Sequence, residues 1–434
     1  MRLSMWMVAV AYATATSSAQ QPANGLAPRA ATRADSATKP PADTAAIARE
    51  RRRMQAANAQ VPPPSPQGVG GAQGPTNPRM LPDFSAVGDL VGDLSEKGST
   101  QADGARFSVR EVELAVQAVV DPFFRGDVFL GISDVEKISI EQAFLTTTAL
   151  PNGLQVQMGR FLMPVGKQNT THRHDLHTVE YPWVIQKFLS DDGLKGTGVT
   201  LSKIFSPFGF YQELIVSAID RFGDPVEGLK ADEAVNKSLD GLGFSARFRN
   251  YVDISQNANF ELSASAITGK RERATGVTSI SGADTSNARL GRQSLLGADL
   301  TFRWKPLQQG LYKSFLLQAE VMHQVSERLA APPGSLGAGG GYLPMSRDFT
   351  GGYVFARWQL SQRLFLGGRY DALQDPAAEG ANFTAGSAFL EWFPSEFSKL
   401  TAQFERATPS QQPALNRILL QAAFAVGPHK PHPF

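Results

Sequence analysis

The strongest constraint in this sequence is a series of alternating segments that extends from about residue 84 to its C-terminal end. In each segment, about a dozen residues alternate apolar and polar side chains, and clusters of Pro, Gly, Asn and Asp separate one segment from the next. We predict sixteen such strands, at residues 84–94, 106–119, 123–133, 136–149, 153–163, 196–205, 208–219, 238–249, 257–268, 294–305, 312–325, 349–360, 363–373, 382–393, 396–406 and 415–427. A tilted strand needs about nine to eleven residues to cross a bilayer, whereas strands of soluble sheets have about five or six. The sequence therefore predicts an all-β chain, folded as a transmembrane antiparallel β-barrel of about sixteen strands; a large soluble β-sandwich is the competing interpretation.

Short and long connections alternate along these segments, as in outer-membrane barrels, which have brief turns at one rim and longer loops at the other. Turns such as Asp121-Pro122 and Ser361-Gln362 follow even-numbered strands, whereas long polar loops follow strands 1, 5, 7, 9 and 11. The short link near Asp134 is an exception on the loop side. It marks either a small outer loop or a strand count that is wrong by one pair.

The period of two predicts which side chains face lipid and which face the interior. In the strand at 294–305, Leu296 and Leu300 are expected to point outward, and Asp299 and Thr301 inward. The same alternation places charges of both signs inside the barrel: Glu111, Glu113, Asp127, Glu141, Asp299, Glu320, Asp371 and Glu391 against Arg125, Arg303, Arg357, Arg369 and Arg417. We expect a polar, water-filled lumen in which most of these charges pair across neighbouring strands.

Composition excludes several other classes of protein. The net charge is only +2 with scattered Lys and Arg, so we expect no nucleic-acid partner. The absence of Cys excludes thiolate metal sites and thiol nucleophiles. The sequence contains no G-x-S-x-G, HExxH or phosphate-binding glycine loop in a suitable context, so we expect that the protein is not an enzyme.

The N-terminal region differs from the rest of the chain. Residues 1–19 have Arg2, an apolar run and the small residues Ser17-Ser18-Ala19, which predict a secretory signal peptide. Residues 20–82 are rich in Ala and Pro and predict a disordered periplasmic linker. The predicted barrel occupies residues 83–434.

Several motifs in this last region are specific enough to compare with known proteins. They are Pro82-Asp83, GRFLMPVGKQN with the THRHDLH that follows, GLKGTGVTLS, GADLTFRWKPLQQGLY, WFPSEFSKL and the ending NRILLQAAFAVGPHKPHPF. They resemble a family of exported Gram-negative outer-membrane proteins, often labelled zinc-regulated (TonB-dependent) outer-membrane receptors and distantly similar to phosphate-selective porins. The resemblance implies a single-chain barrel in the outer membrane of a Gram-negative bacterium, with outer-membrane lipids, lipopolysaccharide and the barrel-assembly machinery as partners.

Chain length favours a passive channel over an energised receptor. A TonB-dependent transporter needs a plug of roughly 150 residues inside a barrel of about 22 strands, and residues 20–82 are too few for one. We therefore expect a porin-like channel for passive passage of small polar solutes or ions. A zinc-related receptor or transporter, and a structural envelope anchor without transport, are the alternatives. Because the chain resembles sixteen-stranded porins, we expect the third outer loop, Pro164 to Lys195, to fold toward the lumen and narrow it.

Histidine is the residue type through which a metal ion could regulate this channel. Five of the six histidines fall into two clusters, His172, His174 and His177 in the third outer loop and His429 and His432 at the C-terminus. Neutral imidazole binds Zn²⁺ well, an extended H-x-H pair places both rings on one side, and Asp175 is a nearby carboxylate. These residues are the candidate ligands of a weakly bound zinc ion, and no cofactor is required. The competing interpretation is a hydrogen-bonded histidine cluster that orders the loop.

Overall fold

The computed structural model describes residues 82–427, apart from the segments 102–103, 134–136, 224–229, 232–240, 275–286, 331–342, 377–379 and 411–412. The predicted signal peptide, the linker up to residue 81 and the C-terminal His429 and His432 lie outside the described residues. Among the described residues, no helix has the length and apolar character needed to cross a membrane.

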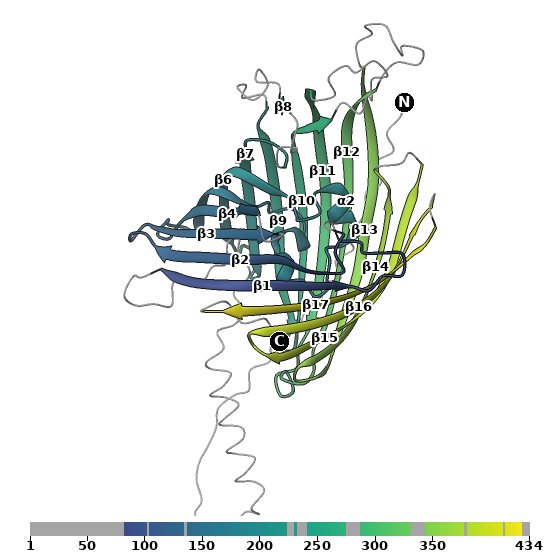
Figure 1. Ribbon diagram of the computed structural model, residues 1–434. Coiled ribbons are helices and arrows are strands. Elements are labelled where there is room, and N and C mark those ends of the chain that lie inside the picture. Colours follow the sequence, from purple (N-terminus) through teal and green to yellow (C-terminus); the bar gives the residue numbers. More distant parts are fainter. Residues whose placement is uncertain are drawn as a thin grey trace, which may run out of the picture. The chain divides into compact units, whose positions relative to one another are not determined.

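Within the described part of the chain, sixteen long antiparallel strands close into a barrel (Figure 1). They are β1 (Asp83–Asp93), β2 (Phe107–Val119), β3 (Phe124–Ser133), β4 (Lys137–Thr147), β5 (Leu154–Leu162), β6 (Lys195–Phe205), β7 (Tyr211–Ile219), β9 (Gly243–Ser255), β10 (Ala258–Ala274), β11 (Asn287–Trp304), β12 (Phe315–Ala330), β13 (Leu343–Ser361), β14 (Leu364–Gln374), β15 (Asn382–Ser395), β16 (Ser398–Pro409) and β17 (Leu415–Val426). A two-residue strand, β8 (Lys230–Ala231), pairs in parallel with the start of β11. The barrel is closed because β1 pairs with both β2 and β17. The predicted sixteen strands are thus confirmed, and β3 and β4 pair as antiparallel neighbours, so the short link between them does not mark a miscount.

Four neighbouring strands, β10 to β13, are longer than the sequence predicts. They have 17, 18, 16 and 19 residues, and each extends at the rim that carries the long loops. Backbone pairing continues there through polar residues such as Lys270 and Arg292. Beyond the apolar band, the alternation of apolar and polar residues ends although the strand continues, so hydrophobic periodicity marks only the part of a strand that faces lipid.

The alternation of side chains agrees with the predicted facing. On β11, Leu296 is 61% exposed on the outer surface, whereas Asp299 is 1% exposed and points inward. On β17, Ile418 and Phe424 are exposed outward and Arg417 is buried inside. An apolar exterior is what a barrel needs where lipid offers no hydrogen-bond partners.

The interior differs from the expected water-filled lumen. The third outer loop, residues 163–194 and called L3 below, contains the 3₁₀ turns η1 (Gln168–Thr170) and η2 (Arg173–Asp175) and the helix α2 (Trp183–Phe188). Apolar side chains of L3 form one buried cluster with inward-facing wall residues that include Leu295 and Met322. Near the loop rim, the expectation of a polar lumen is therefore wrong, because L3 supplies the apolar partners that allow apolar residues to face inward.

Candidate functional site

The base of L3 is closed by a hydrogen-bonded neck. The Met163 amide donates to the Leu194 carbonyl at 2.8 Å, which joins the two ends of the loop. The fully buried Asn169 side chain donates to both the Met163 and Leu194 carbonyls, at 2.8 and 3.1 Å, and accepts from the Leu194 amide at 2.6 Å. Gly193, with φ of +75°, turns the chain into this neck. The two ends of L3 are therefore held together where the loop leaves the wall.

L3 extends inward and binds walls on several sides of the barrel, which confirms the expectation that it folds toward the lumen. The Lys167 ammonium lies 2.9 Å from both carboxylate oxygens of Glu261 on β10. Trp183 donates from its backbone amide to Asp371 on β14 at 2.9 Å, and from its indole to Glu405 on β16 at 3.1 Å. These contacts lie on strands that are distant from one another around the barrel, so L3 spans the interior.

Three side chains of α2 are apolar and fully buried. Val184, Ile185 and Phe188 are each 0% exposed. The Phe188 carbonyl, at the end of α2, accepts a hydrogen bond from Gln324 on β12 at 2.9 Å. A methyl group on Gly351 of β13 would collide with the Leu373 side chain of β14 and would lie 3.2 Å from the tip of the Phe188 ring, so the glycine accommodates the neighbouring strand first and this ring as well.

Most charges predicted to face the interior are paired, as expected. Arg369 lies 2.8 Å from Asp371 on the same strand, and Arg247 lies 3.1 Å from Asp299 two strands away. All four side chains are buried. Buried ions need such partners because an unpaired charge loses several kcal/mol of hydration. These pairs stabilise the wall and do not by themselves form a binding site.

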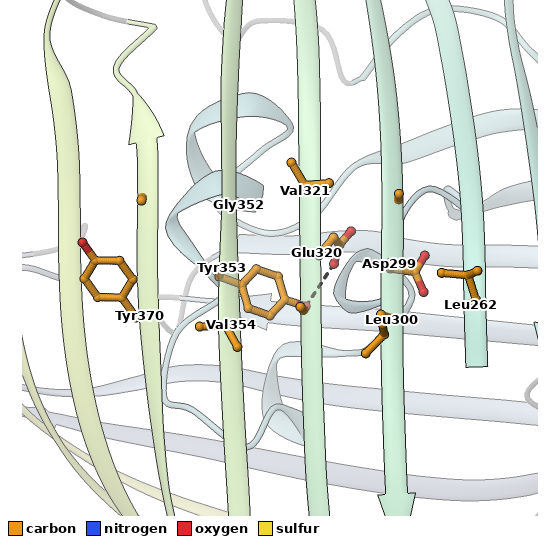
Figure 2. A pocket seen from close by; sticks show the side chains of 12 residues that line it. Leu262, Asp299, Leu300, Glu320, Val321, Gly352, Tyr353, Val354 and Tyr370 are labelled. Carbon is orange, nitrogen blue, oxygen red and sulfur yellow. Dashed lines mark hydrogen bonds between the residues drawn. The ribbon is translucent and has the colours of Figure 1, made fainter. Parts of the chain in front are cut away.

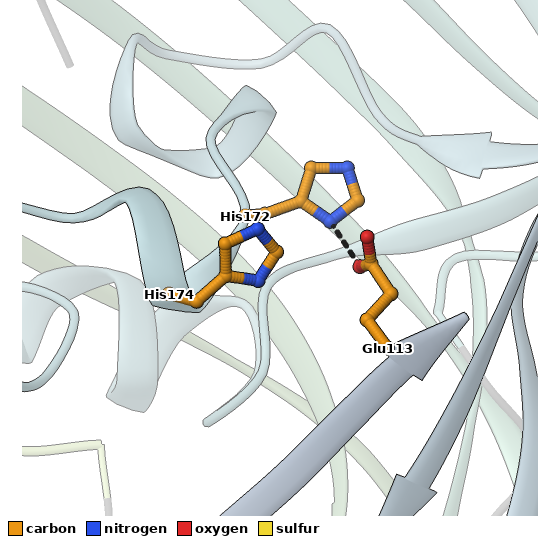
Figure 3. Close-up of side chains that lie close together, drawn as sticks. All are labelled: Glu113, His172 and His174. Atoms are coloured by element: carbon orange, nitrogen blue, oxygen red, sulfur yellow. Dashed lines mark ion pairs between the residues drawn. The ribbon is translucent and has the colours of Figure 1, made fainter. Parts of the chain in front are cut away.

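The candidate metal centre forms where L3 meets β2. Glu113, His172 and His174 each present one ligand atom within 4.8 Å of the others (Figure 3). His172 Nδ1 is 2.7 Å from Glu113 Oε2, and the two imidazole centroids are 5.4 Å apart. The chain brings the two rings together through the 3₁₀ turn η2, not through the extended H-x-H geometry that we expected. One carboxylate and two imidazoles are a ligand set suited to Zn²⁺, which commonly takes a water as its fourth ligand.

The protonation of His172 depends on two opposing neighbours. Burial disfavours the imidazolium, but the negative charge and hydrogen bond of Glu113 outweigh it and raise the pKa of His172 to about 9. On the other side of the ring, the Gln142 amide lies 2.8 Å from Nε2, while its Oε1 accepts from the Leu162 amide. In this orientation the Gln142 NH₂ group donates to Nε2 and opposes the doubly protonated ring that Glu113 favours, while Nδ1 keeps its proton toward Glu113. That Nδ1 proton must leave before a metal ion can replace it between His172 and Glu113.

The other predicted ligands lie outside this group. His177 Nδ1 is 3.2 Å from Glu391 on β15, and its ring stacks on Phe355 at 5.6 Å. Burial and the nearby Arg357 lower the pKa of His177 and keep it neutral. Asp175 lies 3.7 Å from His174 Nε2 and is not one of the three clustered ligands.

Glu113 is the functional candidate that the histidine pattern missed. The sequence placed it on the inner wall, but nothing in its local context points to His172, which follows it by 59 positions. Only the docking of L3 brings the two together. A separation of this kind can be found from a structure or from covariation, not from motif spacing in one sequence.

A larger hollow of about 440 Å³ lies on the outside of the barrel (Figure 2). Ala298, Ala319 and Gly352 line it, and the exposed Leu262 and Tyr370 are at its sides. Its lining is apolar and faces lipid, so this hollow is not part of a path through the interior.

Comparison of the sequence with known proteins finds a distant relative. No model of a known protein family matches the chain. An uncharacterized protein of Aquifex aeolicus (strain VF5) is 26% identical over 367 residues, which are 79% of this chain and 72% of that protein.

Solved structures of outer-membrane proteins are similar in shape although not in sequence. The anion-selective porin from Comamonas acidovorans matches with a TM-score of 0.52 and 11% identity, over 80% of this chain and 99% of the porin. The outer membrane channel DcaP of Acinetobacter baumannii matches with a TM-score of 0.51 and 12% identity, over 82% and 100% of the two chains. A loop-deletion mutant of OmpT, an outer membrane protein of Vibrio cholerae, matches with a TM-score of 0.51 and 9% identity, over 80% and 99%. The chain thus has the closed-barrel fold of outer-membrane porins.

Proposed function

We propose that this protein is a porin-like channel in the outer membrane of a Gram-negative bacterium, through which small polar solutes or ions pass under the control of L3. The observation that carries this proposal is L3 itself, which lies inside a closed barrel and is bound to strands that are far apart around it. The apolar exterior supports insertion among outer-membrane lipids and lipopolysaccharide through the barrel-assembly machinery. The proposal assigns no catalytic role to the barrel.

We also propose that a transition-metal ion regulates this channel at Glu113, His172 and His174. Glu113 belongs to the wall, whereas both histidines belong to L3, so a metal ion bound by all three would cross-link the loop to β2. Metal binding in this position stabilises the docked loop, because a ligand that binds one state preferentially shifts the equilibrium toward it. The expected effect of Zn²⁺ is therefore a lower conductance. The family resemblance links this chain to zinc, and regulation of a passive channel by zinc needs no energy-coupling partner.

The experiment is single-channel recording of the purified barrel in planar bilayers, first with EDTA and then with micromolar Zn²⁺. We expect a small conductance in EDTA that Zn²⁺ reduces further. The double variant H172A/H174A should keep a conductance in EDTA and lose the response to Zn²⁺. His323, a single histidine on β12 that bonds Thr350, provides the control, since H323A should respond to Zn²⁺ as the wild type does. A zinc response that survives in H172A/H174A contradicts the metal site without touching the channel itself.

A structural anchor without transport is the second candidate, and one observation favours it. The apolar cluster between L3 and the wall fills part of the interior with fully buried side chains. An anchor and a gated channel differ in whether loosening L3 opens a path. If neither the wild type nor a variant with weakened L3 packing conducts ions, the anchor is the better description.

A further inference from the structure

The outer faces of β10 and β11 carry two polar pairs near the rim with the long loops. Lys270 and Arg292 are direct partners across the two strands, and Thr268 and Ser294 are the next pair on the same face. Gln293, between Arg292 and Ser294, is 1% exposed and donates to a carbonyl of L3, so its two neighbours point outward. The hydroxyl groups of Thr268 and Ser294 share a hydrogen bond at 2.8 Å. A basic pair and a hydroxyl pair therefore follow one another on the outside of the barrel.

The height of these pairs in the membrane follows from the strand geometry. Trp304, at the other end of β11, stacks on Trp358 at 6.0 Å, and aromatic residues of this kind lie at membrane interfaces. Arg292 lies twelve residues from Trp304. That separation is about 40 Å along the strand, and about 30 Å along the membrane normal at a tilt of about 40°. The hydrocarbon core is also about 30 Å thick. With Trp304 at the periplasmic interface, the basic pair therefore lies among the headgroups of the outer leaflet.

The lipid-facing hollow of about 440 Å³ lies on the same side of the barrel (Figure 2). Ala298 lines it and lies six residues from Arg292 along β11, which is about 15 Å along the membrane normal. One leaflet of the hydrocarbon core has about this thickness. The hollow exists because Ala298, Ala319 and Gly352 present small side chains or none to the lipid. An acyl chain whose headgroup lies at Lys270 and Arg292 therefore reaches the hollow.

The basic pair suits a phosphate group. Two cations directly opposite each other repel, and an anion that contacts both reduces this repulsion. Lys270 and Arg292 also interact within the chain, but an ammonium and a guanidinium each have several N–H donors, so such a contact leaves donors for phosphate oxygens. A second copy of the chain fits less well. Copies in one membrane share its orientation, so a two-fold contact on this face would bring two basic pairs together at the same height.

We propose that the outer faces of β10 to β14 bind a phosphorylated, acylated lipid of the outer leaflet, of the chemical class of lipid A. Lys270 and Arg292 bind a phosphate, Thr268 and Ser294 lie beneath it at the polar linkage of the lipid, and an acyl chain fills the hollow. The long loops of outer-membrane barrels face the cell exterior, which assigns the site to the outer leaflet. The proposal rests on the outer-membrane location of the barrel and not on conduction past L3.

The test is native mass spectrometry of the full chain, freed of lipid, refolded in detergent and titrated with diphosphorylated lipid A. We expect R292Q to bind lipid A about five-fold more weakly than the wild type, and K270Q/R292Q about 25-fold more weakly. R406Q is the matched control. Arg406 is exposed near the same rim on β16, which does not line the hollow, so R406Q should bind as the wild type does. Each variant is first shown to be folded by its migration on gels before and after boiling.

A second pair of variants tests the hollow without a change of charge. A298F places a ring in the space that the acyl chain needs, and should weaken the binding of lipid A by about five-fold or more. A402F makes the same change at an exposed position on the outer face of β16 and should leave binding unchanged. A loss of binding in A298F but not in A402F supports the hollow as the acyl-chain site.

Three results would overturn the proposal. Equal binding of lipid A by wild type and K270Q/R292Q removes the basic pair from the site. Equal affinity of the wild type for phosphatidylglycerol and lipid A makes the surface a general site for anionic lipids. A wild-type oligomer that A298F dissociates makes the hollow an interface between copies of the chain. None of these results depends on conductance, so the proposed channel is tested separately.

Discussion

The substitution F188A tests whether L3 closes the barrel. Phe188 ends α2, is 0% exposed, and its ring packs over Gly351 with its centroid 6.5 Å from that of Phe349. Its carbonyl is held by Gln324, a backbone contact that F188A keeps. The variant therefore removes apolar packing at the α2 side and leaves the neck of L3 and the histidine cluster intact.

The expected magnitude follows from the complete burial of the ring. Truncation of a buried Phe to Ala costs about 3 to 5 kcal/mol, from lost transfer free energy and from the cavity left behind. This cost falls on the docked state of α2, because an undocked loop exposes the side chain in either case. Since about 1.4 kcal/mol is a tenfold change in an equilibrium constant, the population with α2 undocked should rise by on the order of a hundred-fold or more.

The assay is single-channel recording of F188A beside the wild type, with F404A as the matched control. Phe404 is 50% exposed on the outer face of β16, so the same truncation there changes contact with lipid and not the packing of L3. We expect frequent, larger openings in F188A, with weaker ion selectivity than the wild type, and wild-type behaviour in F404A. If folded F188A shows the conductance and open probability of the wild type, L3 does not limit passage and our reasoning about the closed interior is refuted.

Three further predictions concern L3 and the barrel. Burial lowers the pKa of Lys167 to about 8, although Glu261 opposes this shift, whereas the pKa in an unfolded chain is 10.5. Between these two values the unfolded state holds more protons than the folded state, so the stability of the barrel should rise from pH 8 to 10.5. The temperature of the gel-shift transition measures this stability. K167M should lack this component of the pH dependence, and equal slopes in both proteins would contradict it. N169A removes the side-chain hydrogen bonds to Met163 and Leu194, at a cost of about 1–3 kcal/mol for each buried group left unsatisfied. The variant should make L3 cleavable by a protease added to proteoliposomes. If N169A resists the protease as well as the wild type does, the neck does not hold the loop. The barrel should migrate differently on gels before and after boiling, and identical migration would contradict a closed sheet.

The sequence alone determined the architecture of this chain. Strand number and facing are local properties, because each strand that crosses lipid must alternate apolar and polar side chains over a fixed length. The alternation by itself therefore assigns Leu296 and Asp299 to opposite faces, and their exposures agree with that assignment. The position of L3 was predictable from the order of short and long connections, although its resemblance to porin loops was needed to expect that it folds inward. The sequence did not predict the ends of β10 to β13 at the rim that carries the long loops, because backbone pairing there no longer requires an apolar face.

Only the tertiary structure decided what the interior contains. Whether Leu295 faces water or an apolar core depends on α2, a segment more than a hundred residues earlier in the chain, and the expectation of a polar lumen failed for that reason. The same docking adds Glu113 to His172 and His174 and leaves His177 with Glu391 instead. Periodicity in sequence records which environment each face of a strand meets, but it holds no information on which distant segment supplies that environment. Ligand sets and charge balance inside a closed barrel depend on such long-range contacts, and the candidate site follows from them rather than from the pattern of any one segment.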